Sequence, residues 1–290
     1  MLLEQVEYVR PGTVQEALEL LAANEGAAPL AGGQSLVNVL KNRVASVALV
    51  VDVSRLDELR QLRRSADGSL EIGACVTYDE LDRSEDVRRR HRVLADVAGH
   101  IEDQQIRNRG TIGGNCCLSD PTNNLPPILV ALGATMHLRS SRAERSVAAE
   151  QFFKGYFLTA LEPGELLASI TVPPLPPGSG AGYCSLAMAA DSKAIVRAAA
   201  KVTLGPGGSV VEDARVVMAR LAHVPLRATA VEEALAGAPA EEGVVRRATA
   251  RAGDGHEPIS DSHGSGAYRR EMAPVVARRA VLEAIEGARR

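Results

Sequence analysis

Residues 27–40 read AAPLAGGQSLVNVL, and this stretch decides how the first part of the chain folds. The apolar run over 27–30 predicts a strand, two glycines then turn the chain, and an apolar-periodic stretch from Ser35 predicts a helix. Glycine has no Cβ, so backbone amides at such a turn can approach a ligand closely. Unpaired amides at the start of a helix also favour an anion. The stretch is compatible with an anion site, although a glycine pair alone more often marks a plain tight turn.

The segments on either side extend this pattern to an α/β arrangement. Residues 13–24 have apolar side chains at helical spacing, and Thr13 and Glu16 are placed as a capping box. The continuous β-branched run over 48–53 predicts a buried strand. The glycines lack the Gly-x-Gly-x-x-Gly spacing of a dinucleotide fold, and no Gly-Lys-Ser/Thr follows them. Neither of the common phosphate loops is therefore present.

A second glycine pair, Gly113-Gly114, lies within QIRNRGTIGGN over 105–115, and DPTNNLP over 120–126 follows it. Two glycine turns, each flanked by a serine or a threonine, can hold a diphosphate from both sides with main-chain amides. The polar cluster after the second turn can hold a ribose or an adenine edge. A dinucleotide, whose pyrophosphate joins two larger groups, fits such a cradle.

The remaining chain alternates strands and helices around one clear boundary. The boundary is the proline- and glycine-rich stretch 173–182, PPLPPGSGAG, and residues 253–266 form a predicted surface loop. Strands are predicted over about 70–76, 134–139, 166–172, 194–204 and 210–221, and helices over about 93–101, 126–133, 227–236, 240–252 and 267–288. Thr77 with Glu80 repeats the capping-box pattern.

Composition excludes several classes of protein. An apolar share of 46% and a charged share of 24% are those of an ordinary globular protein. A net charge of −3 supplies no basic field for nucleic acid or for an anionic membrane. No signal peptide is apparent at the N-terminus, and no uncharged apolar stretch approaches the roughly 18 residues of a membrane helix. We expect a cytoplasmic protein with no membrane span.

The cysteines and histidines predict no metal site in this chain. Cys75, Cys116, Cys117 and Cys184 include no Cys-x-x-Cys pair, so we interpret them as reduced core residues without an iron–sulfur cluster. The six histidines show no metal-ligand spacing either. We find no general acid, general base or nucleophile constellation, and therefore predict no catalytic residue.

Taken together, these motifs resemble those of a known family. AGGQS at 31–35, QIRNRGTIGGN at 105–115 and DPTNNLP at 120–126 resemble the paired FAD-binding signatures of molybdenum-hydroxylase flavoprotein subunits, the xanthine and carbon monoxide dehydrogenase family. Residues 151–170, QFFKGYFLTALEPGELLASI, resemble the segment that closes the same domain in carbon monoxide dehydrogenase medium subunits. The resemblance covers essentially the whole chain, and it is specific because both signatures occur in this order and separation.

The resemblance implies an α+β fold. An FAD-binding domain over 1–175 is expected to have two subdomains, about 1–55 and 56–175. A flavoprotein C-terminal domain over 176–290 is expected to contain a small antiparallel sheet and helices. FAD is expected to lie extended across the cleft between these parts.

The resemblance also assigns contacts to FAD. The first loop lies along the pyrophosphate, and the second loop contacts its other side. Ile101 packs against the flavin nucleotide, Asn124 bonds a ribose hydroxyl, and Leu167, or its neighbour Leu166, lies near the flavin. Lys193 is assigned to the position of the family lysine beside the flavin ring. The first-loop positions are Pro29, Leu30, Ala31, Gly32, Gly33, Gln34, Ser35 and Leu36, and the second-loop positions are Thr111, Gly113, Gly114 and Asn115.

Three departures from the family pattern affect these assignments. Gln34 stands where many relatives have histidine, but the contact is mostly made by backbone. Asn124 replaces a more usual acid, and its amide can still bond a hydroxyl. After Tyr183 the chain has SLAMAADSKAIV in place of the family's basic stretch, so the family lysine has no secure counterpart in this chain.

The implied activity is that of an oxidoreductase subunit which carries FAD. A large molybdopterin-binding subunit would oxidise the substrate, and a small subunit with [2Fe–2S] clusters would pass electrons to FAD, which delivers them to an external acceptor. The expected assembly is a dimer of heterotrimers, that is, a heterohexamer. The substrate (CO, purine, aldehyde or N-heterocycle) and the acceptor (NAD, quinone or oxygen) stay open.

Two other functions also stay open. A free-standing flavin oxidoreductase, such as an oxidase, would need a substrate-binding cap, but Tyr183 and Tyr268 are the only aromatic residues after the boundary. A non-enzymatic nucleotide-binding scaffold subunit is the other. A visible absorption spectrum would separate the scaffold from both flavin proteins.

Overall fold

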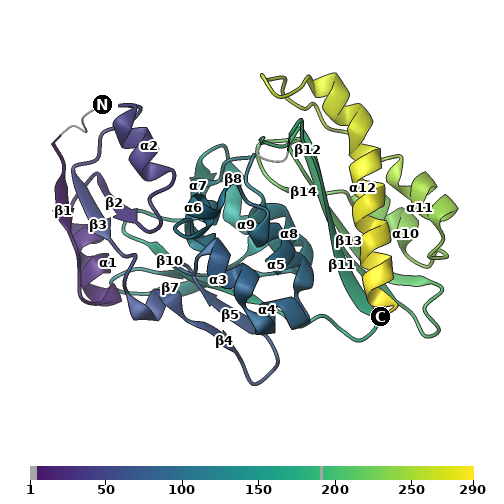
Figure 1. Cartoon of the computed structure of the whole chain (residues 1–290), viewed down its shortest axis with the longest axis horizontal. Helices are drawn as coiled ribbons and strands as arrows, with labels where there is room; N and C mark the ends of the chain where they lie inside the picture. The colour runs from purple at the N-terminus through teal and green to yellow at the C-terminus, as the bar shows by residue number, and fades with distance from the viewer. Residues whose placement is uncertain (1–4, 190–191) are drawn as a thin grey trace.

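A computed structural model describes residues 5–189 and 192–290, so Asp191 of the SLAMAADSKAIV stretch lies outside the described residues. Three larger sheets follow one another along the molecule, each with helices beside it, and two short strands form a separate two-stranded sheet (Figure 1). The predicted α+β class is confirmed. None of the helices in the described part of the chain combines the length and the apolar character needed to cross a bilayer.

The N-terminal sheet is parallel, with strand order β1-β3-β2. The strand β3 is buried along its whole length, as its β-branched sequence predicts. The loop between β2 and α2 holds the first glycine pair. The elements are β1 (Glu7–Val9), α1 (Val14–Ala23), β2 (Ala27–Leu30), α2 (Leu36–Lys41) and β3 (Leu49–Asp52).

The middle sheet is antiparallel, with strand order β4-β5-β10-β6-β7. Helices α5, α7 and α8 contribute to the hydrophobic core on one face, and α8 is buried throughout. The elements are η1 (Asp57–Arg60), β4 (Leu62–Arg64), β5 (Leu70–Gly73), α3 (Tyr78–Arg83), α4 (Glu85–Arg90), α5 (Arg92–Gly99), α6 (Gln104–Arg107), α7 (Ile112–Leu118), α8 (Leu125–Leu132), β6 (Thr135–Arg139), β7 (Glu144–Ala148), α9 (Ala149–Phe152), β8 (Phe153–Gly155), β9 (Leu158–Thr159) and β10 (Leu166–Val172).

The second glycine pair does not form a turn, so that prediction is wrong. Gly113 and Gly114 lie in the first turn of α7, where the Thr111 hydroxyl accepts a hydrogen bond from the Gly114 amide at 3.1 Å. A Cβ on Gly113 would lie 2.5 Å from the Cβ of Ala74. The glycine is therefore needed because the helix packs directly against the end of β5.

One of the two predicted capping boxes is complete. Thr77 and Glu80 bond each other's backbone amides at the start of α3. At the start of α1 the Thr13 hydroxyl accepts from the Glu16 amide, but the Glu16 carboxylate accepts from the amide of Gly12 instead of Thr13. In this box the amide that donates to Glu16 is therefore one residue earlier than predicted.

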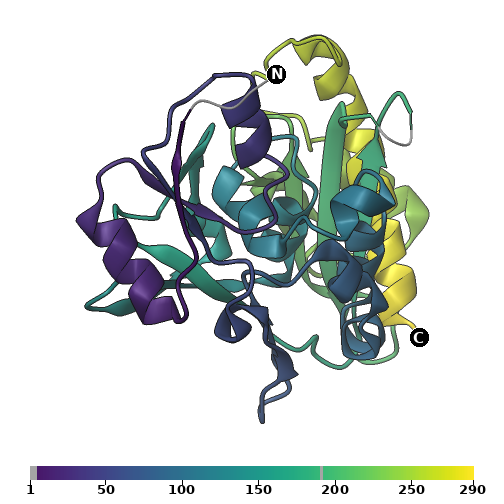
Figure 2. The same ribbon diagram turned by 60° about the vertical axis from the view of Figure 1, so that its left-hand side comes forward.

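We call residues 179–290 the C-terminal unit. Its sheet is antiparallel, with strand order β11-β12-β13-β14, and the long helix α12 runs along it (Figure 1, Figure 2). This unit has a hydrophobic core of its own. Its elements are β11 (Ser179–Leu186), β12 (Val196–Leu204), β13 (Val211–Ala219), β14 (Leu226–Arg227), α10 (Thr229–Leu235), α11 (Glu242–Thr249) and α12 (Gly266–Ala288).

The predicted boundary at 173–182 extends too far, because β11 already begins at Ser179. A Cβ on Gly180 would lie 2.1 Å from the carbonyl oxygen of Ala284, and one on Gly182 would lie 2.2 Å from that of Ala280. These glycines let α12 lie against the strand. They resemble a linker in sequence, but their role is to permit close packing.

Candidate cofactor-binding site

A cavity of about 320 Å³ lies between the first glycine loop, the start of α7 and the beginning of β10. Its volume falls in the range typical of small-molecule sites. Twelve of the predicted cofactor residues line it, which brings the two glycine segments together as expected. These twelve are Pro29, Ala31, Gly32, Gly33, Gln34, Ser35, Leu36, Thr111, Gly113, Gly114, Asn115 and Leu167.

The first loop needs both of its glycines. A Cβ on Gly32 would lie 2.0 Å from the carbonyl oxygen of Arg109, so the loop touches the segment before α7 through bare backbone. Gly33 has a φ of +75°, a left-handed conformation that disfavours other residues. The two glycines therefore fix both the turn and its contact with the opposite wall.

The backbone amides of this loop are free. Among the described residues, the amides of Gly32, Gly33, Gln34 and Ser35 have no hydrogen-bond acceptor. The hydroxyl of Ser35 does not cap α2, so it too is available. Buried or partly buried amides normally have partners, and a row of four without one indicates a ligand with several acceptor atoms. A diphosphate has such atoms.

The second segment contributes differently from the sequence expectation. The amide of Gly113 donates to the carbonyl of Ala74 at 2.9 Å, and those of Gly114 and Asn115 donate to the hydroxyl and carbonyl of Thr111. These amides already have acceptors in the protein, because the segment is a capped helix packed on β5. The expectation that both segments donate amides to one diphosphate is thus not supported for the second segment. It offers side chains instead.

Asn115 lines the cavity and carries a buried acceptor that lacks a donor among the described residues. Its Nδ2 donates to the hydroxyl of Tyr78 at 3.0 Å, which fixes the orientation of the amide. Its Oδ1 is buried and has no donor in the described part of the chain. Burial raises the pKa of Tyr78 well above its usual value, so the phenol stays protonated. A ligand in the cavity that brings a hydrogen-bond donor, such as a sugar hydroxyl, would satisfy this oxygen.

The far wall is apolar apart from one neutralised carboxylate. Glu165 lines the cavity beside Leu166 and Leu167. Arg145 binds it in bidentate fashion, at 2.8 Å and 2.7 Å, and this hydrogen bonding lowers the pKa of Glu165. Since the pair carries no net charge, it does not oppose an anion in the cavity.

Two thiols also face the cavity. Cys75 is buried and Cys117 is half-buried, and both side chains line the site. Burial raises the pKa of each thiol to about 12. Both are therefore uncharged at neutral pH and add to the apolar part of the wall. All four cysteines are free; Cys75 and Cys116 are buried, as predicted for core residues, whereas Cys117 and Cys184 are only partly buried.

Comparison with known proteins decides the family. Residues 4–175 match the model described as the FAD binding domain in molybdopterin dehydrogenase, and residues 181–284 match that of the CO dehydrogenase flavoprotein C-terminal domain. The chain belongs to this molybdopterin dehydrogenase flavoprotein family. The predictions of an FAD cofactor and of the oxidoreductase class are thereby confirmed.

Relatives of the flavoprotein family match over nearly their full length. The chain is 36% identical to the glyceraldehyde dehydrogenase medium chain of Sulfolobus acidocaldarius, over 96% of this chain and 98% of that one. It is 35% identical to the carbon monoxide dehydrogenase medium chain of Afipia carboxidovorans, over 96% of both. A solved structure of reconstituted CO dehydrogenase from Oligotropha carboxidovorans superposes with a TM-score of 0.93 at 34% identity, covering 99% of this chain and 100% of that chain.

Four predicted cofactor residues lie away from the cavity lining. Leu30 is the last residue of β2, before the first loop, and Ile101 is buried in the hydrophobic core beside the middle sheet. Asn124 precedes α8, and its carbonyl accepts from the hydroxyl of Tyr183. Lys193 pairs with Asp120 at 3.5 Å. None of these four side chains faces the glycine loops across the cavity.

The sequence interpretation missed other cavity residues. Asn123 lines the cavity where Asn124 was expected, and its Nδ2 donates to the carbonyl of Asn115 at 2.6 Å. The adjacent asparagines gave a signal, but not which of them faces inward. Tyr78 has no motif of its own, because its place depends on how α3 meets α7.

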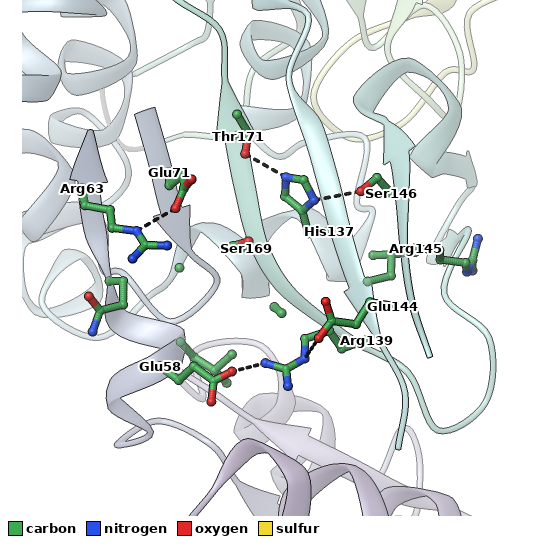
Figure 3. A pocket seen from close by; sticks show the side chains of 15 residues that line it. Glu58, Arg63, Glu71, His137, Arg139, Glu144, Arg145, Ser146, Ser169 and Thr171 are labelled. Carbon is green, nitrogen blue, oxygen red and sulfur yellow. Dashed lines mark hydrogen bonds and ion pairs between the residues drawn. The ribbon is translucent and has the colours of Figure 1, made fainter. Parts of the chain in front are cut away.

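A larger hollow, of about 820 Å³, lies over the exposed face of the middle sheet (Figure 3). Its charged side chains pair with one another across the strands, so it offers no free charge for a ligand. The ion pairs are Arg63–Glu71, Arg139–Glu58, Arg139–Glu144 and Arg145–Glu165, and His137 hydrogen-bonds to Ser146 and Thr171.

Proposed function

We propose that this protein is the FAD-carrying electron-transfer subunit of a heteromeric molybdenum hydroxylase. One observation carries the proposal: four consecutive unpartnered amides, from Gly32 to Ser35, face a cavity in a chain of an FAD-binding family. Relatives carry names such as medium chain and complex subunit, which supports the assignment to an assembly.

The residues of the cavity fit FAD. The amides of Gly32 to Ser35 bind the pyrophosphate, and the Thr111 hydroxyl lies on the opposite side of the cavity. The Oδ1 of Asn115 accepts a hydrogen bond from a ribityl or ribose hydroxyl. Leu166 and Leu167 pack against the apolar ring system, and the neutral Arg145–Glu165 pair leaves the site compatible with a negative charge. When bound, FAD supplies the step between single-electron and two-electron transfer.

The partners follow from this role. A small subunit with [2Fe–2S] clusters supplies the electrons, and a large molybdopterin-binding subunit oxidises the substrate. The complex is a dimer of heterotrimers, and an external acceptor receives the electrons from the flavin. The core of the C-terminal unit, over the residues that the structure describes, is apolar and contains no aromatic side chain, which disfavours a substrate-binding cap and hence a free-standing oxidase.

Purification of the native complex tests the proposal. We expect a flavin spectrum, one FAD extracted per copy of this chain, and co-purification of iron, molybdenum and two further polypeptides. A flavin spectrum without the partners would favour the free-standing oxidoreductase. A complex without any flavin would favour the scaffold subunit. Both outcomes would contradict the proposed function.

A further inference from the structure

One wall of the cavity depends on the short segment 119–124, which connects α7 to α8. It places Asn123 in the cavity lining, and the Asn123 amide side chain holds the carbonyl of Asn115. Within the segment, Asp120 accepts from the amides of Thr122 at 2.7 Å and Asn123 at 2.9 Å. The segment is therefore a compact turn whose inner side contacts α7 at Asn115.

The outer side of this segment is held by the C-terminal unit. Three consecutive carbonyl oxygens accept hydrogen bonds from it. Arg197 on β12 donates through Nη1 to the carbonyls of Thr122 and Asn123, the latter at 3.1 Å. The hydroxyl of Tyr183 on β11 donates to the carbonyl of Asn124 at 3.3 Å. The C-terminal unit therefore determines where this turn lies.

Arg197 is an unusual residue for such a contact. The residue is 3% exposed, and it has no carboxylate partner among the described residues. The hydrogen bonds of its guanidinium go to the two carbonyls and to the hydroxyl of Ser185, which lies 3.2 Å from Nε. A buried cation is costly unless its hydrogen bonds are satisfied, so the guanidinium is stable only while the turn stays in this place.

We propose that Arg197, with Tyr183, is a positioning residue for the cofactor. The C-terminal unit sets the wall of the FAD cavity through a path that runs from Arg197 to Asn123 and on to Asn115. Neither Arg197 nor Tyr183 lines the cavity itself. The inference rests on the proposed binding of FAD between the two glycine segments, and it adds a dependence of that binding on a different part of the chain.

The test compares two arginines on the C-terminal sheet whose side chains each donate to a carbonyl beside the middle sheet. Arg197→Met removes the donors to the turn. Arg215→Met is the matched control, because half-buried Arg215 on β13 donates to the carbonyl of Val130 in α8, away from the cavity. The dissociation constant and release rate of FAD are measured on the full-length chain, with the melting temperature of the FAD-free protein as a measure of folding.

We expect Arg197→Met to weaken FAD binding by about 10- to 100-fold, by analogy with the loss seen when outer-shell partners of a metal site are removed. Arg215→Met should change it by less than about 3-fold. Arg197→Lys, which keeps a donor, should recover part of the loss. In an Asn123→Ala background, Arg197→Met should have a much smaller effect, because both residues act through one segment.

Each outcome is decisive. If the unmodified chain binds no FAD, the proposed function fails. If it binds FAD and Arg197→Met binds equally well, or the effects of Arg197→Met and Asn123→Ala simply add, the positioning role is overturned while the proposed function stands. If Arg197→Met does not fold, Tyr183→Phe replaces it, because this variant removes one hydroxyl at constant shape. Weaker FAD binding by Tyr183→Phe supports the inference, and unchanged binding overturns it.

Discussion

Gly32 and Arg109 meet without any side chain between them: a Cβ on Gly32 would lie 2.0 Å from the Arg109 carbonyl oxygen. This contact joins the loop of the N-terminal sheet to the segment before α7. It determines how far apart the two walls of the cofactor cavity stand.

Gly32→Ala should separate the two walls. The new methyl group overlaps a backbone oxygen, so we expect destabilisation of about 1–3 kcal/mol and loss of most FAD binding. Gly243→Ala in α11 is the control, because a Cβ on Gly243 would meet only Nη1 of Arg247, at 3.9 Å. Thermal unfolding and FAD titration measure both. Equal FAD binding by Gly32→Ala and the unmodified chain would contradict the close contact.

Asn115→Ala should weaken FAD binding through the loss of the unpartnered Oδ1. A hydrogen bond from a ligand hydroxyl to this atom contributes about 0.5–1.5 kcal/mol, so the dissociation constant should rise by about 2- to 12-fold. Asn42→Ala is the control, because exposed Asn42 bonds only the carbonyl of Asn38 with its side chain. Fluorescence titration with FAD measures both variants. An effect of the same size at Asn42 would count against the assignment.

The cavity thiols should report on the cofactor. Burial raises the pKa of Cys75 and Cys117 to about 12, so both react slowly with iodoacetamide at neutral pH. Cys117 should react more slowly still when FAD is present. Cys184 lies outside the cavity, and its reaction should not depend on FAD. Mass spectrometry of modified peptides gives the rates, and protection of Cys184 but not Cys117 would place the cofactor elsewhere.

His91 should make the protein sensitive to acid. The ring is fully buried with both nitrogens unpartnered, and burial, with Arg90 nearby, lowers its pKa from 6.5 to about 4. Between these values the unfolded chain binds a proton that the folded chain does not. The free energy of unfolding should therefore fall as pH drops from 6.5 to 4, by up to about 3 kcal/mol.

Replacement of His91 tests this directly. His91→Leu should remove most of the decline, because leucine does not titrate. Chemical denaturation at several pH values measures the free energy of unfolding for both proteins. The same decline in the variant would show that other groups cause it.

Much of the fold is predictable from local sequence. The amphipathic segment at 13–24 becomes α1, and the β-branched run at 48–53 becomes β3. The proline pair at 126–127 lies in the first turn of α8, where a missing amide costs nothing. These elements form where the local pattern and the tertiary packing agree.

The failures occur where glycine has a packing role. Gly113 and Gly180 look like turn residues, but each lies in regular structure pressed against another backbone. A single sequence does not reveal which element will approach a glycine. The strand β7 was missed for another reason, because its edge position leaves it half-exposed and polar.

The site was predictable in its position but not in its bonding. The sequence pattern identified the two glycine segments, and in the structure Ser35 and Thr111 line one cavity, as the pattern predicts. Whether an amide is free depends on distant partners, such as the Ala74 carbonyl that occupies the Gly113 amide. The contact of Arg197 with the turn at 119–124 spans more than seventy residues and has no sequence signature.

The proposed function requires the amides of Gly32 to Ser35 to bind the pyrophosphate of FAD. An experimental structure of the intact FAD-loaded complex tests it most directly. We predict phosphate oxygens within about 2.7–3.2 Å of these amide nitrogens, with Asn115 Oδ1 bonded to a sugar hydroxyl. A pyrophosphate bound elsewhere, with water on these four amides, would contradict the account.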